Sequence, residues 1–150
     1  MGGAYTITYV RRACSVLLLA LLVACGEKDP VARVIADVAD AAEERDAGAV
    51  LEHLSSHYSD ANGSRKEIEL TLRRYFFAYK TINITVQRLE TTHSSSSGRA
   101  AFRVLFIGAP KSVGGMDQFL PRTASYDFDV WLEKEGGDWK ITTAQWREVQ

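Results

Sequence analysis

The side chains with the clearest capacity for metal chemistry are two histidines and a nearby aspartate. His53 and His57 stand four residues apart, a spacing that places two imidazoles on one face of a helix, and Asp60 could add a third ligand. No His-Glu-x-x-His motif surrounds them. Histidines near the end of a helix are also favoured by the helix dipole. We therefore expect exposed helix-end histidines here and no metal site.

Three aspartates are the candidates for a general base. Such a base needs an apolar cavity that adjusts its pKa. Asp127 and Asp129 alternate with Tyr126 and Phe128, so they should face away from these aromatic rings, and Asp60 lies in a polar turn. Because none falls among inward apolar positions, we expect a non-catalytic domain, with an enzyme that uses a pocket carboxylate as the alternative.

Two cysteines occur, and both lie near the N-terminus, at Cys14 and Cys25. Arg11 and Arg12 precede an uncharged apolar run, residues 16–24. The run is shorter than the roughly 20 apolar residues that a membrane-spanning helix needs. A short apolar run behind a basic segment is typical of a secretory signal.

The sequence Leu22-Val23-Ala24-Cys25 resembles the lipobox of bacterial lipoproteins. The resemblance implies that residues 1–24 are removed as a signal peptide and that Cys25 carries a diacylglyceryl group. Residues 25–30 would then form the lipidated cysteine and a short tether. Gly26, in place of Asp, favours the outer membrane, facing the periplasm, over the inner membrane. An ordinary cleaved signal or an N-terminal anchor is the alternative, and both Sec and twin-arginine export stay open.

The mature chain that this cleavage would leave is mildly acidic. Without Arg11 and Arg12 it has 16 basic and 19 acidic residues, a formal charge of −3. No basic patch stands out, so we expect no nucleic-acid partner. Cys25 would be the sole cysteine, which rules out an internal disulfide. A chain of this length buries enough surface to fold without a metal, and we expect no cofactor.

Residues 29–79 carry helical patterns. Asp29-Pro30 and Asp46 are typical of helix starts, and Ser64 to Glu67 forms a capping box before a third helix. Within each segment the apolar residues recur at helical spacing. They are Val31, Val34, Ile35, Val38 and Ala42, then Val50, Leu51 and Leu54, then Ile68, Leu72, Tyr75, Phe76 and Tyr79.

From residue 82 the apolar period changes to strict alternation, which predicts strands. Ser94 to Gly98 and the pair Gly136-Gly137 predict hairpin turns. Pairing across the second turn would set Leu132 opposite Ile141 and Phe128 opposite Gln145. The four predicted strands are centred on residues 82–87, 99–107, 124–133 and 139–149.

Helices followed by an antiparallel meander predict an α+β domain with its helices on one sheet face. The order is similar to the NTF2-like (SnoaL-like, cystatin-like) α+β roll, in which about three N-terminal helices pack on a curved four-stranded antiparallel sheet. The resemblance, which assigns residues 31–150 to this domain, is carried by Arg45-Asp46, the run Leu54–Asp60, Ser64 and Gly137–Ile141. A different α+β sandwich is the alternative.

That resemblance implies a curved sheet around a long helix, enclosing either a pocket or a filled core. Related enzymes, such as ketosteroid isomerase and polyketide cyclases, use a pocket carboxylate, from which this sequence departs. We expect a small apolar ligand or a protein partner. The candidate pocket-lining residues are Tyr58, Tyr75, Tyr79, Tyr126, Phe128, Trp139 and Trp146.

Two further surfaces bear on partners. Leu105, Ile107 and Trp131 alternate onto the opposite sheet face, and their exposure would favour a homodimer or a contact with an envelope protein. The segment 108–122 is long for a hairpin loop and would either cover the pocket mouth or move freely.

Overall fold

The computed structural model describes residues 28–112 and 114–149. The signal segment, the lipobox and Cys25 lie outside these residues. The helices are α2 (Pro30–Glu43), α3 (Ala47–Glu52) and α4 (Arg65–Ala78), and a short 3-10 helix, η2, spans Met116–Phe119. The strands are β1 (Ser59–Asp60), β2 (Gly63–Ser64), β3 (Tyr79–His93), β4 (Ser97–Pro110), β5 (Thr123–Glu135) and β6 (Asp138–Glu148).

Helix α2 begins where the sequence predicts. The Asp29 carboxylate accepts hydrogen bonds from the backbone N–H groups of Val31 (2.9 Å) and Ala32 (3.2 Å), and Pro30 occupies the first turn. These contacts satisfy amides that the helix itself leaves without partners. The apolar stripe buries Val31 and Ile35, so the predicted amphipathic helix is confirmed.

The other two helix starts are confirmed as well. Asp46 accepts from the Ala49 amide at 3.0 Å, and the Glu67 carboxylate accepts from the Ser64 amide at 2.8 Å in the predicted capping box. The helical prediction for Tyr79 is wrong, because α4 ends at Ala78 and Tyr79 begins β3. Its buried ring packs edge-to-face against Phe106, a contact with a distant strand that no local pattern encodes.

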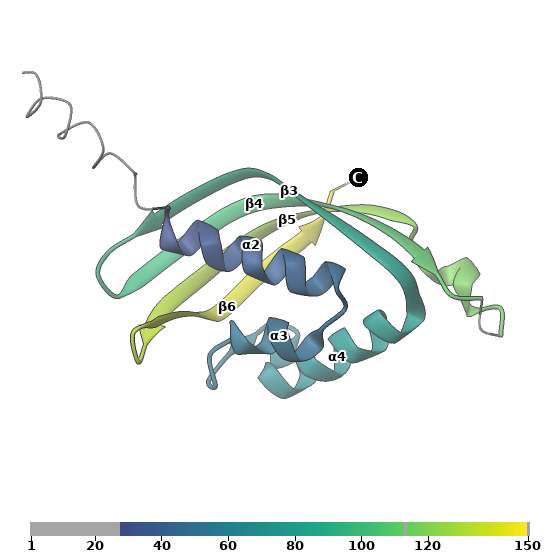
Figure 1. Ribbon diagram of the computed structural model, residues 1–150, viewed down its shortest axis with the longest axis horizontal. Coiled ribbons are helices and arrows are strands. Elements are labelled where there is room, and N and C mark those ends of the chain that lie inside the picture. The colour runs from purple at the N-terminus through teal and green to yellow at the C-terminus, as the bar shows by residue number, and fades with distance from the viewer. Residues whose placement is uncertain (1–27, 113, 150) are drawn as a thin grey trace, which may run out of the picture.

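The long strands form one antiparallel sheet in the order β3-β4-β5-β6. Figure 1 shows α2 lying across one face of this sheet, with α3 and α4 beside it on the same side. We call this the inner face and the opposite one the outer face. The predicted α+β roll, three helices on a four-stranded antiparallel sheet, is confirmed.

Strand β6 contains a bulge that corrects the predicted pairing. Leu132 lies opposite Ile141 as expected, but Phe128 lies opposite Trp146 and not Gln145. The extra residue is Thr142, whose hydroxyl donates to the Trp131 carbonyl at 3.3 Å. Because one inserted residue reverses which side chains face inward, the bulge turns Trp146 toward the helices.

A second bulge interrupts β3. Gln87 pairs with Arg103 and Glu90 with Ala101, so two residues of β3 oppose Phe102 alone. One of them, Arg88, has a φ of +52°, a left-handed conformation that costs a non-glycine residue about 1 kcal/mol or more. Beyond this bulge the alternation is shifted by one residue, which brings Thr91 to the inner face.

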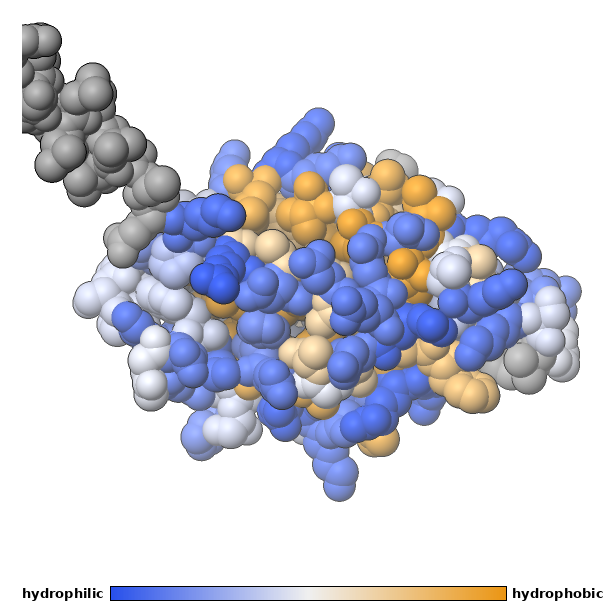
Figure 2. All heavy atoms as spheres, viewed as in Figure 1, coloured by the Kyte–Doolittle hydropathy of each residue, from blue (hydrophilic) through white to orange (hydrophobic). Residues whose placement is uncertain are grey.

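Two hydrophobic clusters hold the domain together. The larger lies between α2 and the strands and includes Val31, Ile35 and Leu132. The smaller surrounds Tyr79 and Phe76 near the other end of the helices. On the face seen in Figure 2, hydrophobic residues gather over the upper part of the sheet, and hydrophilic residues dominate the surface of the helices below. Residues of both clusters line the space between the helices and the sheet.

Candidate functional site

An apolar cavity of about 310 Å³ lies between the helices and the inner face of the sheet. Helix α2 contributes Ile35, Val38 and Ala39, and α4 contributes Ile68, Thr71 and Leu72. The strands supply Ile84, Val86, Phe102, Val104, Phe128 and Trp146, among others. The core is therefore incompletely filled, and the cavity is at the lower end of the size range of small-molecule pockets.

Three aromatic rings form one wall of this cavity, and we call them the aromatic row. Phe102 lies directly opposite Phe128, and Phe128 lies directly opposite Trp146, on three neighbouring strands. The first pair of rings is 5.4 Å apart between centroids and inclined by 5°, and the second pair is 5.9 Å apart and inclined by 25°. Trp146 keeps 39% of its surface exposed, so the row ends where the cavity meets solvent.

The cavity lining contains a single ionisable side chain, that of Tyr58. The buried Tyr58 hydroxyl donates a hydrogen bond to the Asp60 carboxylate. Burial, and then the hydrogen bond and charge of Asp60, raise the pKa of Tyr58 far above its ordinary value of 10.0. Tyr58 therefore stays neutral at physiological pH, and its proton is already engaged outside the cavity.

Asp60 holds a turn in place and does not face the cavity. Its carboxylate accepts from the backbone N–H groups of Asn62 (2.6 Å) and Gly63 (3.1 Å), and it is absent from the cavity lining. Such contacts are typical of an Asx-type turn. The described part of the chain places no carboxylate, histidine or cysteine side chain on the cavity wall.

The structure brings together three of the seven aromatic residues proposed as pocket lining: Tyr58, Phe128 and Trp146. Phe102 completes the wall with them. Its place in the alternation of residues 99–107 with Val104 and Phe106 already indicated which face it occupies. Whether the cavity binds a ligand stays a prediction.

The other four aromatic residues pack elsewhere. Tyr75 and Tyr79 stack with ring centroids 6.4 Å apart, and the Tyr79 hydroxyl donates to the Pro121 carbonyl at 2.8 Å. Burial is the main cause that raises the pKa values of Tyr79 and Tyr126. Trp139 lies edge-on to His93 at the opposite end of the sheet, with centroids 6.0 Å apart.

Asp127 and Asp129 lie on the outer face, as the alternation predicts, and both are paired with arginines. Asp127 accepts from Arg103 at 2.7 Å and from Arg147 at 3.3 Å, and Asp129 is paired with Arg99. Hydrogen bonds from Arg103 and Arg99, followed by their charges, outweigh partial desolvation and hold the pKa values of the two aspartates below 3.8. Both aspartates, together with Arg103 and Arg147, line an open groove of about 590 Å³. Carboxylates held ionised by arginines at a surface are poorly suited to act as bases near neutral pH.

The outer face also carries the residues considered for dimerisation. Ile107 is 47% exposed, and Leu105 and Trp131 are half-buried. Arg99 lies over the Trp131 ring, 5.4 Å from its centroid. The apolar surface at this face is therefore small and interrupted by charged pairs.

The predicted helical face with two histidines does not form. Helix α3 ends at Glu52, His53 caps it, and the next residue, Leu54, bridges to Ile141 of β6. His57 follows in a turn, where its Nδ1 lies 3.1 Å from the Ser56 hydroxyl. Among the residues that the structure describes, no group of three or more His, Cys, Asp or Glu side chains is arranged to hold a metal ion.

The loop after β4 lies at the far end of the molecule from the start of α2 (Figure 1). None of residues 111–122 that the structure describes lines the cavity. Leu120 packs against the cluster around Tyr79, and the Gly108 amide donates to the Arg122 carbonyl at 2.9 Å. The loop thus covers the Tyr79 cluster, and the expectation that it covers the pocket mouth is not met.

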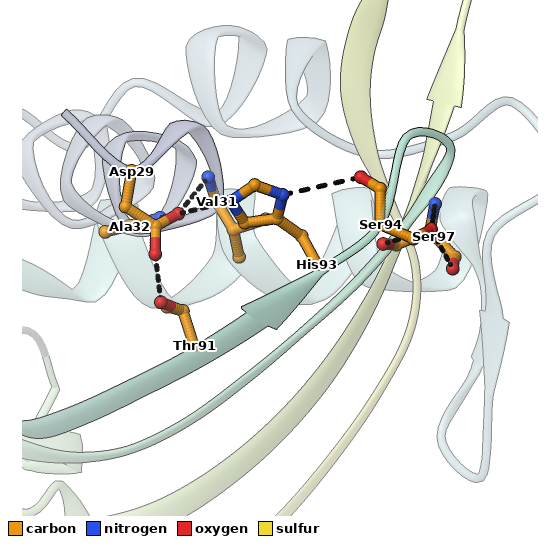
Figure 3. Close-up of polar contacts among 7 residues, drawn as sticks. All are labelled: Asp29, Val31, Ala32, Thr91, His93, Ser94 and Ser97. Carbon is orange, nitrogen blue, oxygen red and sulfur yellow. Dashed lines mark hydrogen bonds and ion pairs between the residues drawn. The ribbon is translucent and has the colours of Figure 1, made fainter. Parts of the chain in front are cut away.

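The start of α2 is fastened to β3 by a small polar cluster (Figure 3). The Thr91 hydroxyl donates to the Asp29 carboxylate, and His93 Nε2 lies 3.9 Å from the same group. Burial acts to raise the pKa of Asp29, but Thr91, the two backbone amides and His93 together hold it below 3.8. This cluster fixes the N-terminal end of α2, and hence the cavity wall that α2 supplies. No helix in the described part of the chain is long and apolar enough to cross a bilayer.

Comparisons with known proteins find the same fold at low sequence identity. Bd1075 from Bdellovibrio bacteriovorus has a TM-score of 0.67 at 10% identity over 79% of this chain, which spans only 40% of the length of that protein. A candidate dehydratase of the NTF2-like family from Streptomyces avermitilis has a TM-score of 0.69 at 9% identity, covering 81% of this chain and 95% of that one. The hexachlorocyclohexane dehydrochlorinase LinA-type3 from Novosphingobium barchaimii has a TM-score of 0.63 at 12% identity, covering 81% and 85%.

No family model matches the sequence, and no curated protein matches it. The likeness to solved structures nevertheless extends over most of the chain. The chain therefore has the NTF2-like, cystatin-like α+β fold. At these identities the likeness concerns the fold alone.

Proposed function

We propose that this chain is a lipid-anchored envelope lipoprotein whose NTF2-like domain binds a small apolar ligand in its cavity without catalysing a reaction. The observation that carries the binding proposal is the chemistry of the cavity wall. It is lined by aliphatic and aromatic side chains together with the hydroxyl residue Thr71, and its one ionisable group, Tyr58, is neutral and already hydrogen-bonded. Such a wall favours the transfer of apolar groups from water and, in the part of the chain that the structure describes, presents no carboxylate, imidazole or thiol.

The anchor is supported by the sequence. The lipobox-like Leu22–Cys25 indicates that Cys25 bears acyl chains, and Gly26 favours the outer membrane facing the periplasm. The five residue steps from Cys25 to Pro30 span at most about 18 Å when extended. The domain would therefore work close to a membrane, which is a reservoir of apolar molecules.

An enzyme with the same cavity is the alternative. Its support comes from the names of two structural neighbours, a candidate dehydratase and a dehydrochlorinase. The position of Asp60 argues against it, because this carboxylate, which bonds the one ionisable lining residue, is engaged by Tyr58 and two backbone amides. A protein partner on the outer face is the other possibility.

Ligand binding is tested with an uncharged fluorescent probe, N-phenyl-1-naphthylamine. Both core clusters lie within residues 31–144, so a chain of residues 25–150 with Cys25→Ser keeps every contact described above. We expect saturable binding of one probe, which Ala39→Leu weakens by about tenfold because the added atoms enter the cavity. Ala36→Leu, on the exposed side of the same helix, is the matched control and should bind as the wild type does. Equal binding by both variants, or none by the wild type, would contradict the proposal.

The anchor is tested separately with the full chain. The wild type should partition with membranes and carry the mass of a diacylglyceryl group on its first mature residue. Cys25→Ser should abolish the modification and release the domain into the soluble fraction. If the Cys25→Ser variant stayed in the membrane fraction, the lipidation proposal would be wrong, and the cavity proposal would not be affected.

A further inference from the structure

The aromatic row depends on the bulge in β6. If Thr142 paired regularly and did not bulge, alternation from Ile141 would turn Thr143 and Gln145 to the inner face. With the bulge, Ala144 and Trp146 line the cavity, and Trp146 stands opposite Phe128. Bulges that re-aim a side chain in this way are common beside binding sites.

The bulge in β3 lies at the other end of the same row. It places two residues opposite Phe102 and holds Arg88 at a φ of +52°. Strain of this kind persists where the surrounding structure requires it, and it is concentrated at functional sites. The bulge in β3 thus lies beside Phe102 and the bulge in β6 sets the inward position of Trp146, and a third register shift, between Tyr79 and Thr81 of β3, lies away from the row.

The geometry of the rings decides what they present to a ligand. Phe102 and Phe128 are nearly parallel, with planes 5° apart and centroids 5.4 Å apart, as in offset-stacked aromatic pairs. Trp146 stacks on Phe128, and its exposure of 39% leaves surface free. An aromatic ligand can extend such a row by offset stacking or by edge-to-face contact.

Size and charge limit the ligand further. An apolar cavity of about 150 Å³ holds one benzene. The present cavity of about 310 Å³ therefore suits roughly two fused rings. A charged group on the ligand would meet no counter-charge, and burial of an unpaired charge is costly.

From these observations we infer that the cavity recognises an uncharged planar aromatic molecule of about two rings, held against Phe102, Phe128 and Trp146. The inference rests on the proposed function and narrows it to one class of ligand. Saturated hydrocarbons of equal size gain the same burial but not the contacts between aromatic rings. The aromatic row should therefore make the cavity bind aromatic ligands more tightly than saturated ones of the same size.

The test measures displacement of N-phenyl-1-naphthylamine from the chain of residues 25–150 with Cys25→Ser. The competitors are naphthalene, its saturated counterpart decalin, and the anion 2-naphthoate. Trp146→Leu should lower the ratio of naphthalene to decalin affinity by about two- to twelvefold, the worth of an aromatic pair. Because the ratio is compared between proteins, the different solubilities of the two hydrocarbons cancel. Trp131→Leu, on the outer face, is the matched control and should leave the ratio unchanged.

Phe102→Leu serves as a second variant, should Trp146→Leu fold poorly, and should lower the ratio as well. We expect 2-naphthoate to compete at least tenfold more weakly than naphthalene. If both hydrocarbons displace the probe and Trp146→Leu and Phe102→Leu leave the ratio unchanged, the aromatic inference is overturned while apolar binding stands. Equal competition by naphthoate overturns the requirement for an uncharged ligand. If the wild type binds neither the probe nor any competitor, the proposed function fails with the inference.

Discussion

The indole of Trp146 stacks on the ring of Phe128 with centroids 5.9 Å apart and planes inclined by 25°. The two residues are cross-strand partners because Thr142 bulges out of the pairing between Ile141 and Thr143. If Thr142 paired in regular register, the cavity wall would end in the Gln145 amide and not in the indole. This dependence gives the first prediction.

Deletion of Thr142 should remove the bulge and leave Trp146 opposite Phe128, because residues 143–146 then follow Ile141 in regular alternation. We expect affinity for N-phenyl-1-naphthylamine to stay within about twofold of the wild type, since the cavity wall is unchanged. Thr142→Ala keeps the bulged residue and loses only the hydroxyl bonded to Trp131, and it should bind the probe equally well. A tenfold loss of affinity on deletion of Thr142 would contradict this register of β6.

Phe128→Ala should destabilise the domain by about 2–4 kcal/mol, because it removes a half-buried ring that contacts Phe102 and Trp146 and enlarges the cavity. Chemical denaturation measures this loss. Phe77→Ala is the control on α4, where the ring is 70% exposed and its removal should change the free energy of unfolding by no more than about 0.5 kcal/mol. Similar losses in the two variants would mean that the cavity wall contributes no packing energy.

The variant Tyr58→Phe tests whether the Tyr58 hydroxyl stabilises the fold or contacts the ligand. The hydroxyl donates to Asp60, so its removal should cost about 1–2 kcal/mol of stability. Probe affinity should stay within about twofold of the wild type, as the hydroxyl is engaged outside the cavity. Tyr75→Phe, whose ring is 47% exposed, is the control and should be neutral in both measurements. A large loss of affinity at unchanged stability would instead make Tyr58 a recognition group.

Because Asp127 and Asp129 are paired with arginines, we expect the free energy of unfolding to fall at acidic pH. The pKa of Asp127 is lowered in the folded protein, chiefly by its hydrogen bond from Arg103. Its contribution is therefore complete above the ordinary value of 3.8 and is lost as the pH falls through the lower folded pKa. Denaturation measured from about pH 6 down to pH 2 should show Asp127→Asn with a shallower acid-induced loss of stability than the wild type. Asp138→Asn, at the exposed β5–β6 turn, should retain the wild-type slope, and parallel slopes in all three proteins would contradict the assignment.

Features set by neighbouring residues could be predicted from the sequence. The helix starts at Asp29, Asp46 and Ser64 depend on side chains that reach amides two or three residues away. Alternation indicated the face of the strand residues away from the bulges, so the outward position of Asp127 also followed. The order of these elements sufficed for the fold.

Features set by distant contacts could not be predicted. The β6 bulge is held by a hydroxyl that reaches across to Trp131, and Tyr79 is drawn into β3 by packing on Phe106. Alternation predicts which face of the sheet a residue occupies but not which part of a strand the helices cover. For this reason the sequence favours Trp139 and Tyr126 as residues of the cavity lining, although both lie outside it.

The account's central claim is that the cavity holds an uncharged apolar molecule, and native mass spectrometry tests it most directly. The full chain would be purified from membranes in mild detergent, beside the variant Ala39→Leu. We predict that the wild type retains a neutral small molecule, released on unfolding, and that Ala39→Leu retains much less of it. A wild-type spectrum free of bound ligand that stays so after incubation with naphthalene, or an equal adduct in both proteins, would contradict the claim.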